Sequence, residues 1–166
     1  MVYLYTCAFS NCEMFSDAFP SSERFGGSVI AVKSEMINIE AFKGDMGDAD
    51  DVDDQDQRVN NVAHGFKYNE SKFTKAQFGA WIKPYLKRVG ERKWGDTPDA
   101  PEFAQFKANC QEFAKFVLGN FSEFEFYMNE ENDMDGSLAL CYWEDSENDK
   151  GPTFLYLKDG MLKNKI

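Results

Sequence analysis

Apolar residues recur every three or four positions in two segments near the middle of the chain, the spacing that places them on one face of a helix. In the first segment, "FTKAQFGAWIKPYLKRV", these residues are Phe78, Trp81, Ile82, Tyr85, Leu86 and Val89. In the second segment, from about Pro101 to about Gly119, they are Phe103, Phe106, Cys110, Phe113 and Val117. Two amphipathic helices joined by a short linker predict an antiparallel helical hairpin over about 74–120.

Residues near the ends of these segments predict how the helices begin. Thr74 and Gln77 fit a capping box, and Phe73 with Phe78 fits a hydrophobic staple. Asp99 and Glu102 form a candidate cap pair for the second helix. Pro84 removes one backbone hydrogen bond, which predicts a kink in the first helix or a break near Lys83.

The segments on either side of the hairpin have the alternating pattern and composition of strands. Strand-like stretches occupy 1–7, 26–33, 59–68, 123–128, 137–144 and 153–158, whereas the composition of 10–23 is typical of a turn or long loop. The order of strands, two helices and strands predicts a single α+β domain over 1–166 with a mainly antiparallel sheet.

Charge is distributed unevenly along the chain, whose formal net charge is −11. From Glu40 to Asp56 there are 8 acids and 1 base (net −7), and from Lys72 to Lys93 there are 7 bases and 1 acid (net +6). The overall charge disfavours nucleic-acid binding. With few apolar side chains, 40–58 is expected to be a mobile acidic loop, and the basic segment is a candidate docking face for an acidic partner.

The stretch "ENDMDGSLALCYWE" begins like a calcium-binding EF-hand loop, with Glu131, Asp133 and Asp135 at alternate positions before Gly136. However, the position that needs a bidentate glutamate is occupied by Tyr142, and a strand pattern follows instead of a helix. We therefore predict a β-hairpin whose turn uses Asp135 and Gly136. A weak cation site on these acids stays open, as does weak calcium binding by the acidic loop.

The candidate chemistry of the remaining residues is limited. Cys7, Cys110 and Cys141 lie in apolar patterns and are expected to be buried. Cys12 lies in the predicted loop and is the best candidate for a reactive thiol, although an inert thiol is favoured. His64 is the only histidine; its neighbours Ala63 and Gly65 give no nucleophile signature, so a structural or exposed histidine is expected. There is no Cys-x-x-Cys pair, no signal-peptide pattern and no apolar run long enough for a membrane span, so a cytoplasmic location with reduced thiols is expected.

Several motifs in chain order resemble the translationally controlled tumour protein family over nearly the whole sequence: "EMFSD", "FTKAQFGAWIKPYLKRV", "NFSEFEFYMNEENDMDG" and "FLYLKDGM". The resemblance implies a twisted β-tent with a projecting helical hairpin and no enzymatic activity. It also implies a cytosolic protein linked to growth and survival that binds calcium, tubulin and a small GTPase. Glu13 matches the GTPase-contacting glutamate, and Lys75, Lys83, Lys87 and Arg88 are the candidate tubulin-binding residues.

The sequence departs from the family pattern at Asn129, which replaces a glycine, and at its end, "LKNKI", which lacks the terminal cysteine of many animal members. A monomer is therefore expected. Two alternatives remain open from the fold that the resemblance implies. One is a thiol-dependent oxidoreductase of the methionine sulfoxide reductase type, and the other is a nucleotide-exchange factor for a small GTPase.

Overall fold

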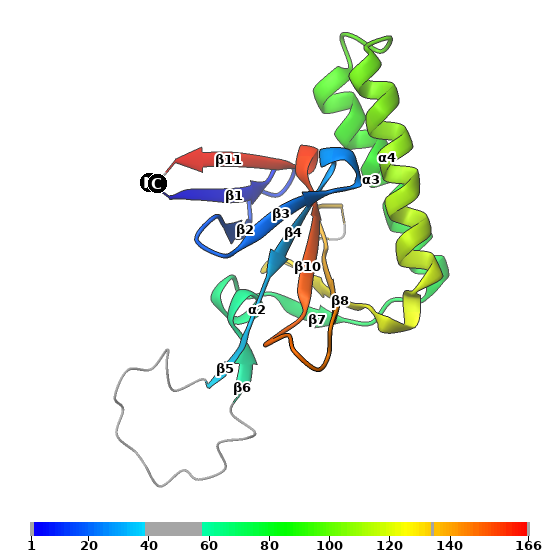
Figure 1. Cartoon of the computed structure of the whole chain (residues 1–166). Coiled ribbons are helices and arrows are strands. Elements are labelled where there is room, and N and C mark those ends of the chain that lie inside the picture. The colour runs from blue at the N-terminus through cyan, green and yellow to red at the C-terminus, as the bar shows by residue number, and fades with distance from the viewer. Residues whose placement is uncertain (1, 39–57, 134, 166) are drawn as a thin grey trace, which may run out of the picture.

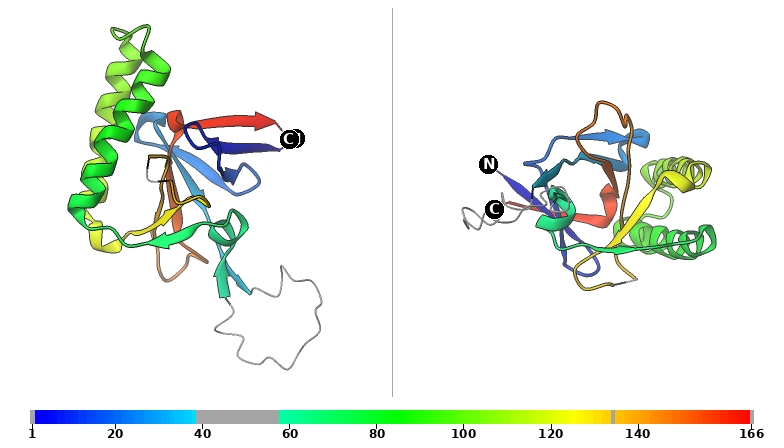
Figure 2. Two further views of the ribbon diagram at one scale, coloured as in Figure 1. Left: turned by 180° about the vertical axis from the view of Figure 1, so that it is seen from behind. Right: turned by 90° about the horizontal axis from the view of Figure 1, so that it is seen from below.

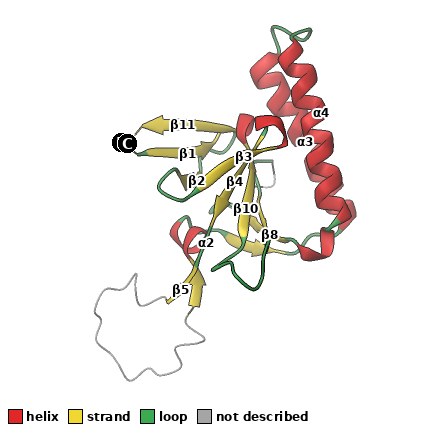
Figure 3. Cartoon of the chain, in the orientation of Figure 1, coloured by secondary structure: helices red, strands yellow, loops and turns green. Residues whose placement is uncertain are grey.

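Strands and a pair of long helices make up the computed structural model, which describes residues 2–38, 58–133 and 135–165 (Figures 1 and 3). The largest sheet has six strands in the order β3 (Ser21–Arg24), β4 (Val29–Lys33), β10 (Thr153–Leu157), β9 (Ala139–Tyr142), β8 (Glu125–Met128) and β7 (Asn69–Ser71). All of its pairings are antiparallel. The α+β prediction is therefore confirmed, and the acidic segment expected at 40–58 lies outside the described residues apart from Arg58.

Two smaller sheets complete the strand arrangement. One has the order β11 (Met161–Lys165), β1 (Tyr3–Cys7) and β2 (Glu13–Ser16), and its β1–β11 pairing brings the two ends of the chain together. The other pairs β5 (Met36–Asn38) with β6 (Arg58–Asn60). Short 3-10 turns, η1 (Phe25–Gly27), η3 (Phe121–Glu123) and η4 (Lys158–Gly160), connect neighbouring elements.

The core has two layers because alternate residues of the central strands point to opposite faces of the sheet. One face packs against the helical hairpin, using Ala31, Leu140 and Leu155. The other face packs against the three-stranded sheet and a short helix, using Val32 and Phe154. Figure 2 shows the hairpin on one side of the six-stranded sheet and β1 with β11 on the other.

The helical hairpin consists of α3 (Lys75–Trp94) and α4 (Pro101–Gly119). The predicted capping box is present: the backbone N–H of Gln77 donates to Thr74 Oγ1 at 3.1 Å, and the Thr74 N–H donates to Gln77 Oε1 at 2.9 Å. The helix continues past the end of the apolar pattern because the Trp94 ring packs on Phe103 and Phe106, with centroids 5.2 and 5.0 Å away.

The structure bears on two expected details of the hairpin: the kink or break at Pro84, and the cap of the second helix. α3 is not broken near Lys83, since Pro84 and Ala80 both lie on its exposed side, where water can bind the carbonyl that proline leaves unpaired. The predicted Asp99–Glu102 cap is absent: Ala100 is the N-cap and makes no side-chain bond, and Pro101 occupies the first turn.

Three segments of the β region were also assigned wrongly from sequence. The expected loop at 10–23 contains β2 and β3, with Met14 and Phe15 fully buried. The strand expected at 59–68 gives only β6 before the helix α2 (Asn61–Gly65), because the Asn60 side chain accepts hydrogen bonds from the first N–H groups of that helix. The strand β11 near the end of the chain was missed.

Candidate partner-binding surfaces

The outer face of α3 carries three lysines, Lys75, Lys83 and Lys87, whose side chains are exposed. None of them forms an ion pair within the part of the chain that the structure describes. The opposite face of α3 is fixed to the sheet. There the Trp81 indole N–H donates to the Gly136 carbonyl at 3.0 Å, and the Tyr85 hydroxyl lies 2.5 Å from Ser137 Oγ. The lysines therefore project from a rigid, anchored helix.

Arg88 is placed differently from these lysines, with which it was named as a candidate tubulin-binding residue. Its guanidinium donates to the backbone carbonyl of Asp135 and lies 4.7 Å from the centre of the Phe9 ring, and the residue is half-buried. Arg88 thus links α3 to the β8–β9 connection. Its role in binding a partner stays a prediction.

The last turn of α3 is also bound internally, which shortens the accessible basic surface. Lys93 Nζ lies 2.5 Å from Asp159 Oδ1, and the Arg92 guanidinium donates to the Asp159 carbonyl at 2.8 Å. The Asp159 carboxylate therefore offsets the charge of Lys93, and Arg92 is held beside it while keeping its own charge. The exposed lysines of α3 that form no ion pair to a described residue are Lys83 and Lys87, with Lys75 in the first turn.

Glu13, the candidate GTPase contact, lies at the start of β2, where it pairs with Thr6 of β1 across a bulge. Its side chain is exposed and makes no hydrogen bond or ion pair to any described residue. The nearby acid Asp17 differs, since its Oδ1 accepts a hydrogen bond from the Tyr3 N–H at 2.9 Å. The structure therefore leaves the Glu13 carboxylate accessible, on a different element from the lysines.

The β8–β9 connection forms the predicted hairpin but does not use a two-residue Asp135-Gly136 turn. Gly136 instead closes a four-residue turn, its N–H donating to the Asp133 carbonyl at 3.1 Å, within a connection that runs from 129 to 138. Asn129, fully buried, shapes this connection: its Oδ1 accepts from the N–H groups of Glu131 and Asp133 at 3.1 and 3.0 Å. The asparagine that departs from the family pattern is thus a structural residue.

A weak cation site on Glu131, Asp133 and Asp135 stays a prediction. No group of three or more His, Cys, Asp or Glu side chains able to hold a metal ion occurs among the described residues. Tyr142 lies in β9, as a hairpin requires and an EF-hand does not. The acidic segment at 40–58, the other candidate for weak calcium binding, lies outside the described residues apart from Arg58.

The four cysteines are all free, and three are buried as predicted: Cys7, Cys110 and Cys141. Burial raises the pKa of Cys110 to about 12 and that of Cys141 further. For Cys7, burial also opposes ionisation, but hydrogen bonds from Ser10 and Ser137 outweigh it and lower the pKa. Cys12 is half-buried and is the most accessible of the four thiols.

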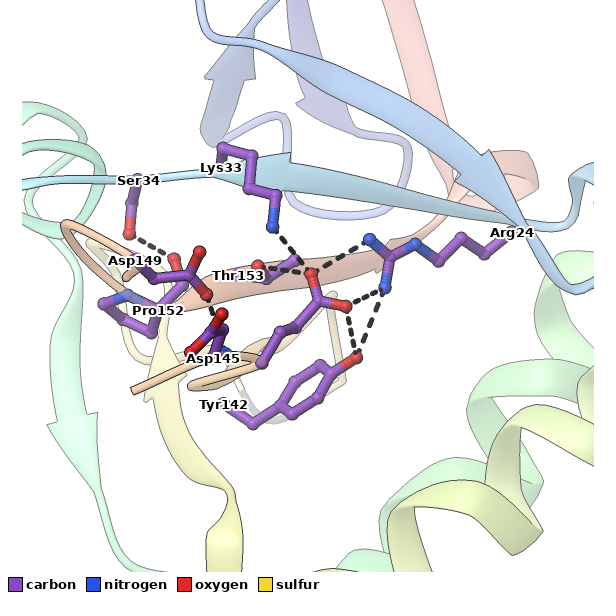
Figure 4. Close-up of polar contacts among 9 residues, drawn as sticks. Arg24, Lys33, Ser34, Tyr142, Asp145, Asp149, Pro152 and Thr153 are labelled. Atoms are coloured by element: carbon purple, nitrogen blue, oxygen red, sulfur yellow. Dashed lines mark hydrogen bonds and ion pairs between the residues drawn. The ribbon is translucent and has the colours of Figure 1, made fainter. Parts of the chain in front are cut away.

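The most strongly perturbed carboxyl group in the described structure is Glu144, which the sequence did not single out. Its carboxylate accepts from Arg24 at 2.6 and 3.0 Å, from Lys33 Nζ at 2.8 Å, from the Tyr142 hydroxyl at 3.0 Å and from Thr153 Oγ1 at 2.9 Å (Figure 4). The Arg24 hydrogen bonds, aided by the other donors against the cost of burial, hold the Glu144 pKa well below its usual range. Glu144 thus connects β3, β4, β9 and β10 through side-chain hydrogen bonds.

A β-tent with a helical hairpin on one side, and with exposed charges on several separate elements, defines an α+β protein with more than one candidate contact surface. The family model for translationally controlled tumour protein matches residues 2–162. Homologues from Dictyostelium discoideum and Yarrowia lipolytica are each 32% identical to the chain over 164 residues, covering 92% and 95% of both sequences, respectively. The chain belongs to the translationally controlled tumour protein family.

Solved structures of family members have the same fold. The Schizosaccharomyces pombe protein p23fyp superposes with a TM-score of 0.78 at 25% identity, covering 99% of both chains. The Caenorhabditis elegans protein superposes with a TM-score of 0.73 at 22% identity, covering 99% of this chain and 98% of that one. Among the described residues, neither α3 nor α4 nor any other helix is long and apolar enough to cross a membrane.

Proposed function

We propose that this protein is a non-enzymatic, cytoplasmic binding protein linked to growth and survival that contacts several partners through separate surfaces. In this proposal α3 binds tubulin through Lys75, Lys83 and Lys87, Glu13 contacts a small GTPase, and calcium binds weakly. Family membership supports this class of function, and the positions of Glu13 and of the lysines on different elements support separate surfaces.

The observation that carries the tubulin proposal is the accessibility of the α3 lysines. Lys83 and Lys87 lie one helical turn apart, opposite the buried side chains of Phe78 and Tyr85. A helix anchored on its inner face presents these cations without the loss of backbone entropy that ordering a loop would require. Acidic segments such as the tails of tubulin are the complementary partner, and such contacts between exposed charges weaken as salt screens them.

Microtubule co-sedimentation across a salt series tests this proposal. The double charge reversal Lys83→Glu/Lys87→Glu is expected to weaken binding about tenfold or more, and added salt should weaken binding of the unmodified protein. Lys150→Glu/Lys165→Glu is the matched control, since it makes the same change in net charge at two exposed lysines outside the helices. An equal loss of microtubule affinity in both double variants would show that only net charge matters, and would contradict a specific role for Lys83 and Lys87. Microtubule binding that does not depend on salt would also contradict the proposal.

The GTPase contact has its own test. Glu13→Gln removes the charge while keeping the size of an exposed side chain, so the protein should fold normally and lose affinity for its GTPase. Nucleotide release measured over a panel of small GTPases shows whether the contact also promotes exchange. Glu112→Gln, at an exposed position on α4, is the control. Binding unchanged by Glu13→Gln would remove this residue from the proposed surface.

The thiol oxidoreductase alternative requires an accessible, reactive cysteine, and only Cys12 is a candidate by exposure. Alkylation of Cys12 should leave partner binding unaffected if the protein acts without thiol chemistry. A methionine sulfoxide reductase activity that disappears on Cys12→Ser would favour the alternative instead.

A further inference from the structure

A cleft of about 500 Å³ lies between the edge of the six-stranded sheet and α2, and none of the α3 lysines lines it. In Figure 1 the chain passes from α2 into β7, and β6 lies beside α2. We refer to this hollow as the β7–α2 cleft. Its lining includes Tyr68, Glu70, Glu125, Tyr127 and Trp143. A volume of this size accommodates a side chain of a partner together with part of its backbone.

Aromatic side chains form much of the wall of the β7–α2 cleft. Tyr68 and Tyr127 have ring centroids 6.1 Å apart, and Trp143 is 39% exposed, the largest exposure of any aromatic side chain among the described residues. The Tyr68 ring is held in place because its hydroxyl bonds Tyr156 at 2.6 Å and the Met14 carbonyl inside the core. The cleft therefore offers pre-positioned aromatic rings, of which the indole is available to a partner.

Two carboxylates border the same rings. Glu70 of β7 pairs directly with Tyr127 of β8, and Glu125 lies two residues before Tyr127, so all three side chains share one face of the sheet. Both glutamates are exposed, and neither forms an ion pair within the described residues. Their negative charge adds to burial in raising the pKa values of Tyr127 and Cys141, so the negative field of the two glutamates reaches the β7–β8 wall of the cleft.

The other wall of the cleft carries one positive charge, that of Arg58 on β6. Arg58 lines the cleft and forms no ion pair to a described residue. The two glutamates therefore favour binding of a cation at the β7–β8 wall of the cleft, whereas the positive charge of Arg58 opposes binding of a cation. This arrangement predicts opposite effects for removing the two kinds of charge.

We propose that the β7–α2 cleft binds an arginine side chain from an extended segment of a partner protein. A guanidinium is planar, stacks on aromatic rings and offers several N–H donors to carboxylates, which fits Tyr127, Trp143, Glu70 and Glu125 better than the compact, strongly hydrated ammonium of lysine does. The strand β7 is the end of its sheet, so its outer edge can pair with an extended partner segment beside the cleft. This surface is separate from those of the proposed tubulin and GTPase contacts.

A nitrogen-15 NMR titration of the whole protein tests the proposal with two small probes. The first probe is the blocked peptide acetyl-Val-Arg-Val-amide, and the second replaces arginine with citrulline, which has nearly the same shape without the charge. The arginine peptide should cause saturable shifts of the Trp143 indole N–H and of the Glu70 and Tyr127 amides. The citrulline peptide should bind about tenfold more weakly. Equal affinity for both peptides, or no saturable shift with arginine, would overturn the proposal.

Variants give a second, independent measure. Glu70→Gln/Glu125→Gln should weaken binding of the arginine peptide about tenfold, whereas Glu102→Gln/Glu112→Gln on α4 should leave it unchanged. Arg58→Gln should tighten binding, about twofold or more, because it removes the opposing cation. A dispersed spectrum checks that each variant is folded. Weaker binding in Arg58→Gln would contradict the assigned charge pattern even if the double glutamate variant failed to fold.

Discussion

Replacing Glu144 with glutamine is the most direct test of how the sheet is held together. The side chain would keep its size but lose its negative charge, and one acceptor oxygen would become an amide N–H₂ that faces the donors of Arg24 and Lys33. In the native protein the Glu144 carboxylate accepts from four side chains on β3, β4, β9 and β10. The substitution therefore disturbs contacts among all four strands without changing the apolar core.

The size of the expected destabilisation depends on how exposed Glu144 and its two cationic partners are. The Glu144 side chain is 24% exposed, that of Arg24 30% and that of Lys33 45%. A hydrogen bond to a charged group contributes about 1.5–3 kcal/mol, whereas an exposed ion pair contributes about 0.2–1 kcal/mol. Because these groups are partly solvated, we expect a loss of about 2 kcal/mol in the free energy of unfolding. For a chain of this length that corresponds to a fall of about 4–8 °C in the melting temperature.

The stability difference should depend on pH in one direction. The folded state lowers the pKa of Glu144 below its unfolded value of about 4.3. Its contribution to stability is therefore fully present above the unfolded pKa and is lost as pH falls toward the folded pKa, because the unfolded state takes up the proton first. The gap between the unmodified protein and Glu144→Gln should be constant from about pH 7 to 5 and shrink from about pH 4 to 2.

Urea unfolding followed by circular dichroism at each pH measures this gap. Glu147→Gln is the matched control: it makes the same chemical change three residues away, at an exposed side chain with no partner among the described residues. It should alter the free energy of unfolding by less than about 0.5 kcal/mol. Equal destabilisation in both variants, or a Glu144→Gln gap that persists unchanged at pH 2, would refute the reasoning.

Three further predictions concern packing, thiols and a helix cap. Gly90→Ala should lower the melting temperature, because a Cβ there would lie 2.7 Å from the Phe103 ring. The control Gly79→Ala, on the same helix, places its Cβ where no atom lies within 4 Å and should stabilise the protein by about 0.5–1 kcal/mol. A stabilising effect of Gly90→Ala would contradict the packing of α3 on α4. With an alkylating reagent, mass spectrometry of the native protein should show Cys12 modified well before the three buried cysteines, and simultaneous modification of all four would show that the core opens readily. Asn60→Ala should cost about 1–2 kcal/mol in urea unfolding, since Asn60 caps α2 and also donates to Ser34 Oγ at 2.8 Å, and a loss below the experimental error would argue against the cap.

The helical hairpin could be predicted because its signals are local. The apolar spacing from Phe78 to Val89, the Thr74–Gln77 box and the limits Pro101 and Gly119 all lie within a few residues of the structure they specify. Burial of three of the four cysteines followed from the same kind of pattern. The order of these elements predicted the α+β class, and the family motifs added the arrangement of a β-tent with a projecting hairpin.

The predictions from sequence that were wrong concern residues whose structure depends on partners far away in the chain. The sequence of β2 and β3 is rich in turn formers and therefore predicts a loop, yet Met14 and Phe15 are buried once β2 pairs with β1. Arg88 was grouped with the outer lysines because helix spacing does not reveal that Phe9 and the Asp135 carbonyl lie beside it. Glu144 carried no sequence signal, since its donors are spread from Arg24 to Thr153.

The sequence by itself determined where the long helices form, which of their faces is apolar and where charge is concentrated, since all of these depend on neighbouring residues. Tertiary structure decided which charged groups remain accessible. It left Lys83, Lys87 and Glu13 exposed, occupied Lys93 and Arg88 internally, and brought Glu70 and Glu125 beside Trp143. The physical reason is that the strength of an electrostatic or aromatic contact depends on distance and solvent exposure, and both are set by strand pairing between residues far apart in the chain.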